Sequence, residues 1–160
     1  MTQVTLPQLN FPKMDFRFKE IDNHLSIFDA VRRKWLVLTP EEWVRQNMVS
    51  FLCHYFQVPM SRIANEVSLV YNKRRLRCDS LVYDDKGQAL MLIEYKAPNI
   101  ALTQSVFDQV SVYLQEYQVP YVLVSNGQVH YFCRVDRKNG QYLVSQKLPN
   151  YGTLLAKSKE

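Results

Sequence analysis

The segment LMLIEYKAPN, from Leu90 to Asn99, limits the fold more than any other stretch of this 160-residue chain. Its first four residues are apolar, which is typical of a strand that enters a hydrophobic core. Glu94 and Lys96 follow on the same strand, and side chains two positions apart lie on one face of a strand. The sequence therefore predicts a core strand that brings a carboxylate and an ammonium group to one place.

Helix and strand patterns on both sides of this segment indicate the fold class. The expected elements are a short strand over residues 35–38, a helix over 41–57, strands over 62–71, 75–84 and 89–96, a second helix between 103 and 120, and strands over 121–125, 129–135 and 141–144. A capping box at Thr39 and Glu42 supports the first helix. A strand meander followed by a helical crossover predicts an α/β (α+β) fold with a central mixed sheet flanked by helices.

The length of the chain predicts one domain with its own core. We expect an irregular N-terminal segment over residues 1–26, a core over 27–145 and a polar tail over 146–160. No run approaches the roughly 18 apolar residues of a membrane helix, and the first residues lack the apolar region of a secretory signal. We therefore expect a cytoplasmic protein with no membrane contact. Its scattered cysteines, without metal-ligand spacing, are interpreted as reduced core residues.

The positive charge of the chain is gathered in two runs. Lys and Arg total 20 against 15 for Asp and Glu, which gives a net charge of +5. Lys73, Arg74, Arg75 and Arg77 form one run, and residues 32–34 form the other. Clustered positive charge favours a polyanionic partner, although solvated turns explain such runs equally well.

Asp79, on the strand before Glu94, completes a constellation of charged residues. A tight turn joins the two strands, so they are expected to pair antiparallel with Asp79 about level with Glu94. Two buried carboxylates are costly unless a positive charge offsets them. One explanation is a divalent cation such as Mg²⁺, with Lys96 orienting or deprotonating a water for phosphodiester hydrolysis. The other is an ion pair between Glu94 and Lys96 on an edge strand.

The chain resembles a known family in four stretches, IFDAVRRKWLVLTPEEWVRQ, RLRCDSLVYDDKGQALMLIEYKAP, VFDQVSVY and VPYVLVSNGQVHYF. It is similar to the N-terminal domain of type I restriction enzyme R subunits, in a short stand-alone form, with the PD-(D/E)xK nuclease core. The resemblance covers roughly residues 27–132. It implies a restriction-type DNA endonuclease that depends on Mg²⁺ or Mn²⁺.

The resemblance also implies roles for individual residues. Asp79 and Glu94 would be the metal carboxylates, Tyr95 would add its backbone carbonyl, and Lys96 would be the catalytic lysine. Gln109 and Tyr113 match a Q-x-x-x-Y element that in related nucleases lies beside the site and contacts DNA. Cys78 departs from the family pattern, because it stands where a proline is usual.

Other residues have two explanations each. Glu42 is either an additional metal-side carboxylate or only part of the capping box, and we favour the cap. Glu66 either faces the site or pairs with an arginine, and we favour the pair. Tyr113 either contacts DNA or packs in the core. Arg77 either holds a phosphate, together with Lys73, Arg74 and Arg75, or neutralises the carboxylates.

Full R subunits similar to this domain continue into an ATP-driven motor. This chain lacks the G-x-x-x-x-G-K-[ST] phosphate-binding motif, so we expect cleavage without a motor or with a motor on a separate protein. The expected partners are DNA and either a second copy of the chain or a separate motor or specificity subunit. The alternative function is a catalytically silent DNA- or partner-binding module on the same fold.

Overall fold

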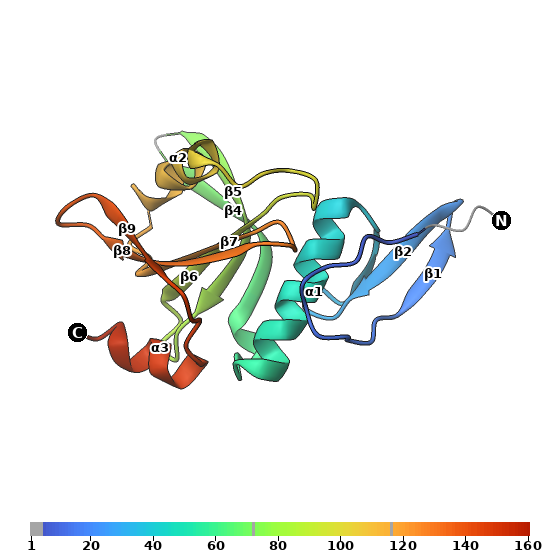
Figure 1. Cartoon of the computed structure of the whole chain (residues 1–160), viewed down its shortest axis with the longest axis horizontal. Coiled ribbons are helices and arrows are strands. Elements are labelled where there is room, and N and C mark those ends of the chain that lie inside the picture. The colour runs from blue at the N-terminus through green and yellow to red at the C-terminus, as the bar shows by residue number, and fades with distance from the viewer. Residues whose placement is uncertain (1–4, 72, 116) are drawn as a thin grey trace.

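The computed structural model describes residues 5–71, 73–115 and 117–160. The elements are β1 (Phe18–Ile21), β2 (His24–Asp29), β3 (Lys34–Val37), α1 (Pro40–Tyr55), β4 (Ile63–Tyr71), β5 (Arg74–Tyr83), β6 (Ala89–Tyr95), α2 (Gln104–Leu114), β7 (Tyr121–Ser125), β8 (His130–Asp136), β9 (Gln141–Ser145) and α3 (Tyr151–Lys157). Strands β1–β3 form one sheet and β4–β9 form another, each in chain order. Helix α1 lies between the two sheets (Figure 1).

The six-stranded sheet is mixed, as the sequence predicts. All neighbouring strands pair antiparallel except β6 and β7, which are parallel. Parallel neighbours need a crossover connection, and α2 provides it. Strand β7 lies between β6 and β8, and all five of its residues are buried. This explains why its sequence, YVLVS, lacks the polar alternation of a strand with one wet face.

Helices cover both faces of this sheet. On one face, residues of α1 and α3 such as Met48 and Leu154 pack against Met91 and Ile93 of β6. On the other face, α2 packs through Val106, Val110, Tyr113 and Leu114 against Leu92, Val122 and Val124. The first helix begins as predicted, because the Glu42 amide donates to Thr39 Oγ1 at 3.1 Å. The central sheet with its flanking helices confirms the predicted fold class.

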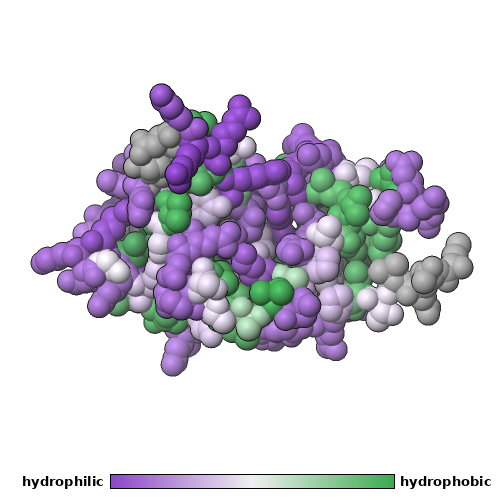
Figure 2. Space-filling model, turned by 90° about the horizontal axis from the view of Figure 1, so that it is seen from above, coloured by the Kyte–Doolittle hydropathy of each residue, from purple (hydrophilic) through white to green (hydrophobic). Residues whose placement is uncertain are grey.

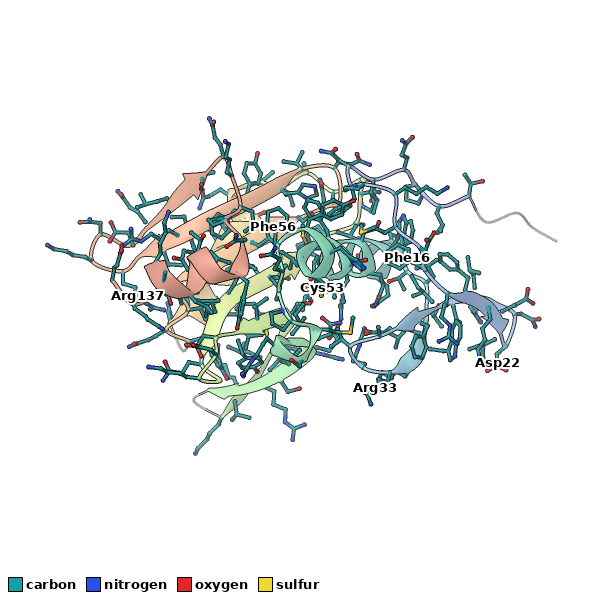
Figure 3. The ribbon with its side chains drawn as sticks, turned by 90° about the horizontal axis from the view of Figure 1, so that it is seen from below. Phe16, Asp22, Arg33, Cys53, Phe56 and Arg137 are labelled. Carbon is teal, nitrogen blue, oxygen red and sulfur yellow. The ribbon has the colours of Figure 1, made fainter. Side chains whose placement is uncertain are left out.

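The predicted irregular N-terminal segment is only partly irregular. Residues 5–17 form no helix or strand, whereas residues 18–21 and 24–29 form β1 and β2 of the smaller sheet. Asp22 and Asn23 join these strands with φ values of 50° and 60°, the left-handed conformation that a two-residue hairpin turn requires. Figure 3 shows Asp22 at the far end of this sheet and Phe16 beside α1. Phe18 and Val37 are exposed, and apolar surface is visible over this part of the molecule (Figure 2).

The C-terminal residues also depart from prediction, because α3 replaces the expected polar tail. Asn150 caps this helix by accepting from the Thr153 amide at 2.9 Å, and its Tyr151 and Leu154 are buried. Helix α2 ends at Leu114, short of the predicted Pro120 limit. No helix in the described ranges is long and apolar enough to cross a membrane. All three cysteines are free, with Cys78 and Cys133 buried.

A strap of residues 8–11 crosses the turn between β7 and β8. The Asn10 amide donates to the Gly127 carbonyl at 2.7 Å, and Gln128 Nε2 donates to the Gln8 carbonyl at 2.5 Å. Leu9 lies directly on Gly127, where an added Cβ would approach the Leu9 Cδ2 atom to 2.7 Å. Glycine also suits the φ of +84° at this position.

Candidate active site

Asp79 stands where β5 and β6 separate. The ladder between these strands reaches the pair Ser80 and Ile93, and one step further Asp79 is level with Glu94, as predicted. There the Asp79 carboxylate takes the place of a strand carbonyl, because its Oδ2 accepts the backbone N–H of Tyr95 at 2.9 Å. This hydrogen bond fixes the carboxylate over the end of β6.

Glu94 is buried beside Asp79, with 5% of its surface exposed. Burial, followed by the charge of Asp79, raises the pKa of Glu94 to about 8, and the charge of Lys96 opposes this increase. Burial also raises the pKa of Asp79, while the Tyr95 hydrogen bond and the charge of Arg45 oppose it. Two neighbouring carboxyl groups in a desolvated place cannot both ionise easily. The pair therefore retains a proton at neutral pH, and we assign it to Glu94.

Lys96 follows at the end of β6 and is held by α2. Its Nζ donates to Gln109 Oε1 at 3.0 Å, and its backbone N–H donates to the Ser125 carbonyl at 2.9 Å. Its charge acts on Glu94, which places the ammonium group within electrostatic range of the carboxylates. The structure therefore brings Asp79, Glu94, Lys96 and Gln109 to one region, as the sequence predicted.

Tyr113, the second residue of the Q-x-x-x-Y element, is buried in the α2 cluster. Its hydroxyl donates to the Arg77 carbonyl at 2.7 Å. Burial, then the charges of Glu94 and Asp79, raise the pKa of Tyr113 to about 12. Core packing beside the carboxylates therefore accounts for this side chain, and its hydroxyl supports the β5 backbone.

Glu42 and Glu66 are both engaged in ion pairs. The Glu42 carboxylate accepts from Arg32 and from Gln46, each at 2.9 Å. Glu66 pairs with Arg45 and Arg77, which confirms the pairing favoured from sequence and gives Arg77 a partner other than Asp79. In the described ranges no group of three or more Asp, Glu, His or Cys side chains is arranged to hold a metal. The structure therefore does not join Glu42 to the Asp79 and Glu94 pair.

A buried polar network behind β6 was missed by sequence reasoning. The Tyr95 hydroxyl donates to Ser80 Oγ at 2.9 Å, Ser80 donates to Asn65 at 2.6 Å, and Asn65 donates to Asp29 at 3.2 Å. Asp29 in turn accepts from Arg32 at 2.5 Å. Asn65 and Ser80 are polar residues at inward-facing positions of otherwise apolar strands. This pattern was the sequence signal that could have predicted the network.

Arg45 was also missed. It lies on α1 three residues after Glu42, its side chain is buried, and it contacts Glu66. The spacing of Glu42 and Arg45, one helical turn apart, was the available signal.

The donor set at Asp79 and Glu94 fits a hard divalent cation. Glu94 Oε2 is buried, and apart from the neighbouring Asp79 carboxyl group it has no hydrogen-bond partner in the described part of the chain, although buried polar atoms are normally paired. Mg²⁺ is usually held by one or two carboxylates, with water and phosphate oxygens in its other positions. The carboxyl groups of Glu94 and Asp79 would be these one or two ligands.

A cavity of about 620 Å³ lies away from this site. It is lined by Ala89 and Leu90 at the start of β6 and by Arg134, Arg137 and Lys138 near the β8–β9 turn. Glu94 and Lys96 lie at the opposite end of β6, so the cavity is separate from the carboxylate pair. Figure 3 shows Arg137 at the end of the molecule opposite Asp22.

The family can be assigned at this point. Residues 40–149, about two thirds of the chain, match the family model of the type I restriction enzyme R protein N terminus (HSDR_N). This chain belongs to that family. The match spans α1 to β9 and includes Asp79, Glu94 and Lys96. No curated protein gives a match.

Solved structures similar to this family member include restriction enzymes. A fragment of an HsdR subunit of a type I restriction enzyme from Vibrio vulnificus YJ016 has a TM-score of 0.54 at 15% identity, over 76% of this chain and 25% of that one. The type IIG restriction endonuclease BpuSI has a TM-score of 0.45 at 15% identity, over 74% of this chain and 15% of that one. The present chain thus spans about a quarter of the HsdR fragment and shares its fold.

A smaller protein is also similar. A protein assigned as a DUF820 nuclease from Anabaena variabilis ATCC 29413 has a TM-score of 0.47 at 11% identity, over 94% of this chain and 98% of that one.

Proposed function

We propose that this chain is a restriction-type DNA endonuclease that acts in the cytoplasm and uses Mg²⁺ or Mn²⁺. The observation that carries the proposal is the buried Glu94 carboxyl group, whose Oε2 has no partner in the described residues other than the Asp79 carboxyl group. Membership of a restriction enzyme family supports the reaction class. Lys96, two residues after Glu94, supports hydrolysis over a purely structural ion pair, because its ammonium group is bonded to Gln109 rather than to the carboxylate.

The residues of the chain have separate tasks in this proposal. Asp79, Glu94 and the Tyr95 carbonyl would hold the cation. A bound divalent ion supplies Lewis-acid polarisation of the phosphate and activation of water. Lys96 Nζ would orient the attacking water and accept or return its proton, and Gln109 would hold Nζ in position. Binding of the cation must displace the proton that Glu94 retains at neutral pH.

The DNA-binding surface in this proposal is the turn between β4 and β5. Lys73, Arg74, Arg75 and Arg77 are exposed there, and strongly hydrophilic side chains project from this part of the molecule (Figure 2). This positive charge extends along β5 to Asp79 and would attract DNA phosphates toward the carboxylates. Arg32 is not available for this task, because Asp29 and Glu42 hold its guanidinium group and only 16% of its side chain is exposed. Arg77 pairs with Glu66 but keeps 67% of its side chain exposed.

The proposed partners follow from the comparison with a subunit of a larger enzyme. The HsdR fragment is part of a type I restriction enzyme and is about four times as long as the part matched here, and by analogy we propose that this chain acts with a second copy of itself or with a separate motor or specificity subunit. This comparison also supports the alternative proposal, a DNA- or partner-binding module that is silent by itself.

The deciding experiment combines metal binding with plasmid cleavage. Wild-type protein with Mn²⁺ or Mg²⁺ is expected to nick supercoiled DNA and to gain thermal stability from the metal by mass action. Lys96→Ala is expected to lower the nicking rate by about 100-fold or more, while the metal still raises the melting temperature. Glu94→Ala is expected to lose both effects.

The matched control is Lys86→Ala, which removes an exposed lysine from the β5–β6 turn and should leave cleavage unchanged. Metal binding without cleavage would favour the silent module, and co-purification of a motor or DNA-reading protein would then identify its partner. If neither Mn²⁺ nor Mg²⁺ alters the melting temperature of the wild type, the metal site is wrong.

A further inference from the structure

Buried polar atoms without a partner occur on helix α1 and on strand β6. In the described ranges, three buried side-chain nitrogen or oxygen atoms have no hydrogen-bond partner, namely Arg45 Nε, Arg45 Nη1 and Glu94 Oε2. Arg45 is 4% exposed, and a buried charge is costly unless partners of opposite charge offset it. An arginine that keeps two unpaired donors beside a carboxylate site therefore requires an explanation.

The contacts of Arg45 connect α1 with the strands of the site. Its Nη2 donates to Glu66 on β4, and its Nε lies 3.8 Å from Glu42 Oε2. The centre of its guanidinium group is 5.6 Å from the centroid of the Tyr95 ring on β6. Because Glu42 is also held by Arg32 and Gln46, Glu66 is the direct partner of the Arg45 charge.

Glu66 lies beside Asp79. The β4–β5 ladder pairs Asn65 with Ser80 and Val67 with Cys78, so the intervening step sets Glu66 opposite Asp79. Glu66 has a φ of 57°, a left-handed conformation that is uncommon for a residue of this type and especially inside a strand. Ion pairs with Arg45 and Arg77 hold its side chain.

Both members of this ion pair lie beside the candidate metal ligands. Glu66 is opposite Asp79 on the neighbouring strand, and the Arg45 guanidinium group lies over the ring of Tyr95, the residue after Glu94. Charges at these positions alter how strongly a cation binds to the two carboxylates.

We propose that Arg45 is a positioning residue that holds Glu66 away from the metal and opposes the metal with a buried positive charge. This inference rests on the proposed metal site at Asp79 and Glu94. Its consequence is a site with two carboxylates rather than three, which leaves coordination positions open for water and phosphate oxygens. A third carboxylate would hold the ion more tightly and occupy a position that the substrate needs.

The test is calorimetric titration of the full chain with Mn²⁺ alone at pH 8.5. Arg45→Met is expected to tighten Mn²⁺ binding by about 10-fold or more, because a repelling charge is lost and Glu66 keeps only the exposed Arg77 as a partner. Glu66→Gln should weaken binding by about 10-fold, because the Arg45 charge is no longer offset. The double variant Arg45→Met with Glu66→Gln should return close to wild type, and Arg45→Lys, which keeps the charge, should also stay close to it.

The control is Arg134→Met, the same substitution at an exposed position on β8, which should leave the affinity unchanged. If Arg45 has a purely structural role, Arg45→Met should bind Mn²⁺ more weakly than wild type. A folded Arg45→Met protein that binds Mn²⁺ as tightly as wild type, or more weakly, overturns the inference. If this variant does not fold, an unchanged affinity in Glu66→Gln overturns it instead. Wild-type protein that binds no Mn²⁺ would contradict the proposed metal site itself.

Discussion

Glu94 shows how one side chain connects burial with chemistry. The apolar run before it predicts a buried strand, and the turn at residues 84–87 sets the position of Asp79 opposite it. Both features can be predicted from sequence, because strand alternation and a tight turn fix the face and the register. Arg45 could not be predicted in this way, because a helical arginine is normally exposed and only tertiary contacts reveal its burial.

Glu94 also makes the stability of the metal-free protein depend on pH. Its pKa is about 8 in the fold against an ordinary value of 4.5, so folding favours the protonated form. The contribution of Glu94 to the free energy of unfolding is complete below about pH 4.5 and is lost as the pH rises to about 8. At about 1.4 kcal/mol for each pKa unit, this loss is on the order of 5 kcal/mol.

Urea denaturation of the metal-free protein from pH 5 to 9 measures this effect. We expect Glu94→Gln to remove most of the decline, because an amide does not ionise. Glu160→Gln is the control, since its side chain is exposed. If the free energy of unfolding of Glu94→Gln falls with pH as much as that of wild type, a group other than Glu94 causes the decline.

At the scale of elements, sequence prediction succeeded where capping or turn residues mark the end of a helix or strand, and it failed where such residues give only a weak signal. Thr39 as the N-cap, followed by Pro40, correctly predicts where α1 begins. The Asn126-Gly127 turn correctly separates β7 from β8. The first two strands were missed because Asp22-Asn23 is a weaker hairpin signal than Asn-Gly. Helix α3 was missed because its seven residues, YGTLLAK, have only a short apolar pattern, and the core contacts of Leu154 stabilise it.

The β4–β5 turn provides a prediction at this scale. Replacing Lys73, Arg74 and Arg75 with alanine should weaken binding of a duplex oligonucleotide to catalytically inactive Lys96→Ala protein. If each residue neutralises one phosphate, the slope of log K against log salt should decrease by about 2 to 3. Fluorescence anisotropy between 50 and 200 mM salt measures this slope.

Stability should change little in this triple variant, because all three side chains are exposed. Lys138→Ala, in the turn between β8 and β9, is the matched control and should leave the slope unaltered. An unchanged slope in the triple variant would exclude this turn from the DNA-binding surface.

At the scale of the whole molecule, the six-stranded sheet depends on helices that lie on both faces. Helix α3 closes the face that α1 covers only in part, and Leu154 is 1% exposed in that cluster. Leu154→Ala should therefore lower the free energy of unfolding by about 2–4 kcal/mol. Chemical denaturation measures the change, and Lys157→Ala, on the exposed side of α3, should stay within about 0.5 kcal/mol of wild type. A small effect of Leu154→Ala would mean that α3 is not part of the cooperative unit.

The close contact of Leu9 with Gly127 joins two segments that are far apart in the chain. Residue 9 lies outside the family match, whereas residue 127 lies within it. A larger residue at position 127 would displace the end of the Leu9 side chain and would have to adopt a φ of +84°, which glycine adopts without strain. We therefore expect the identity of residue 127 to influence how tightly the leading segment packs on the turn between β7 and β8.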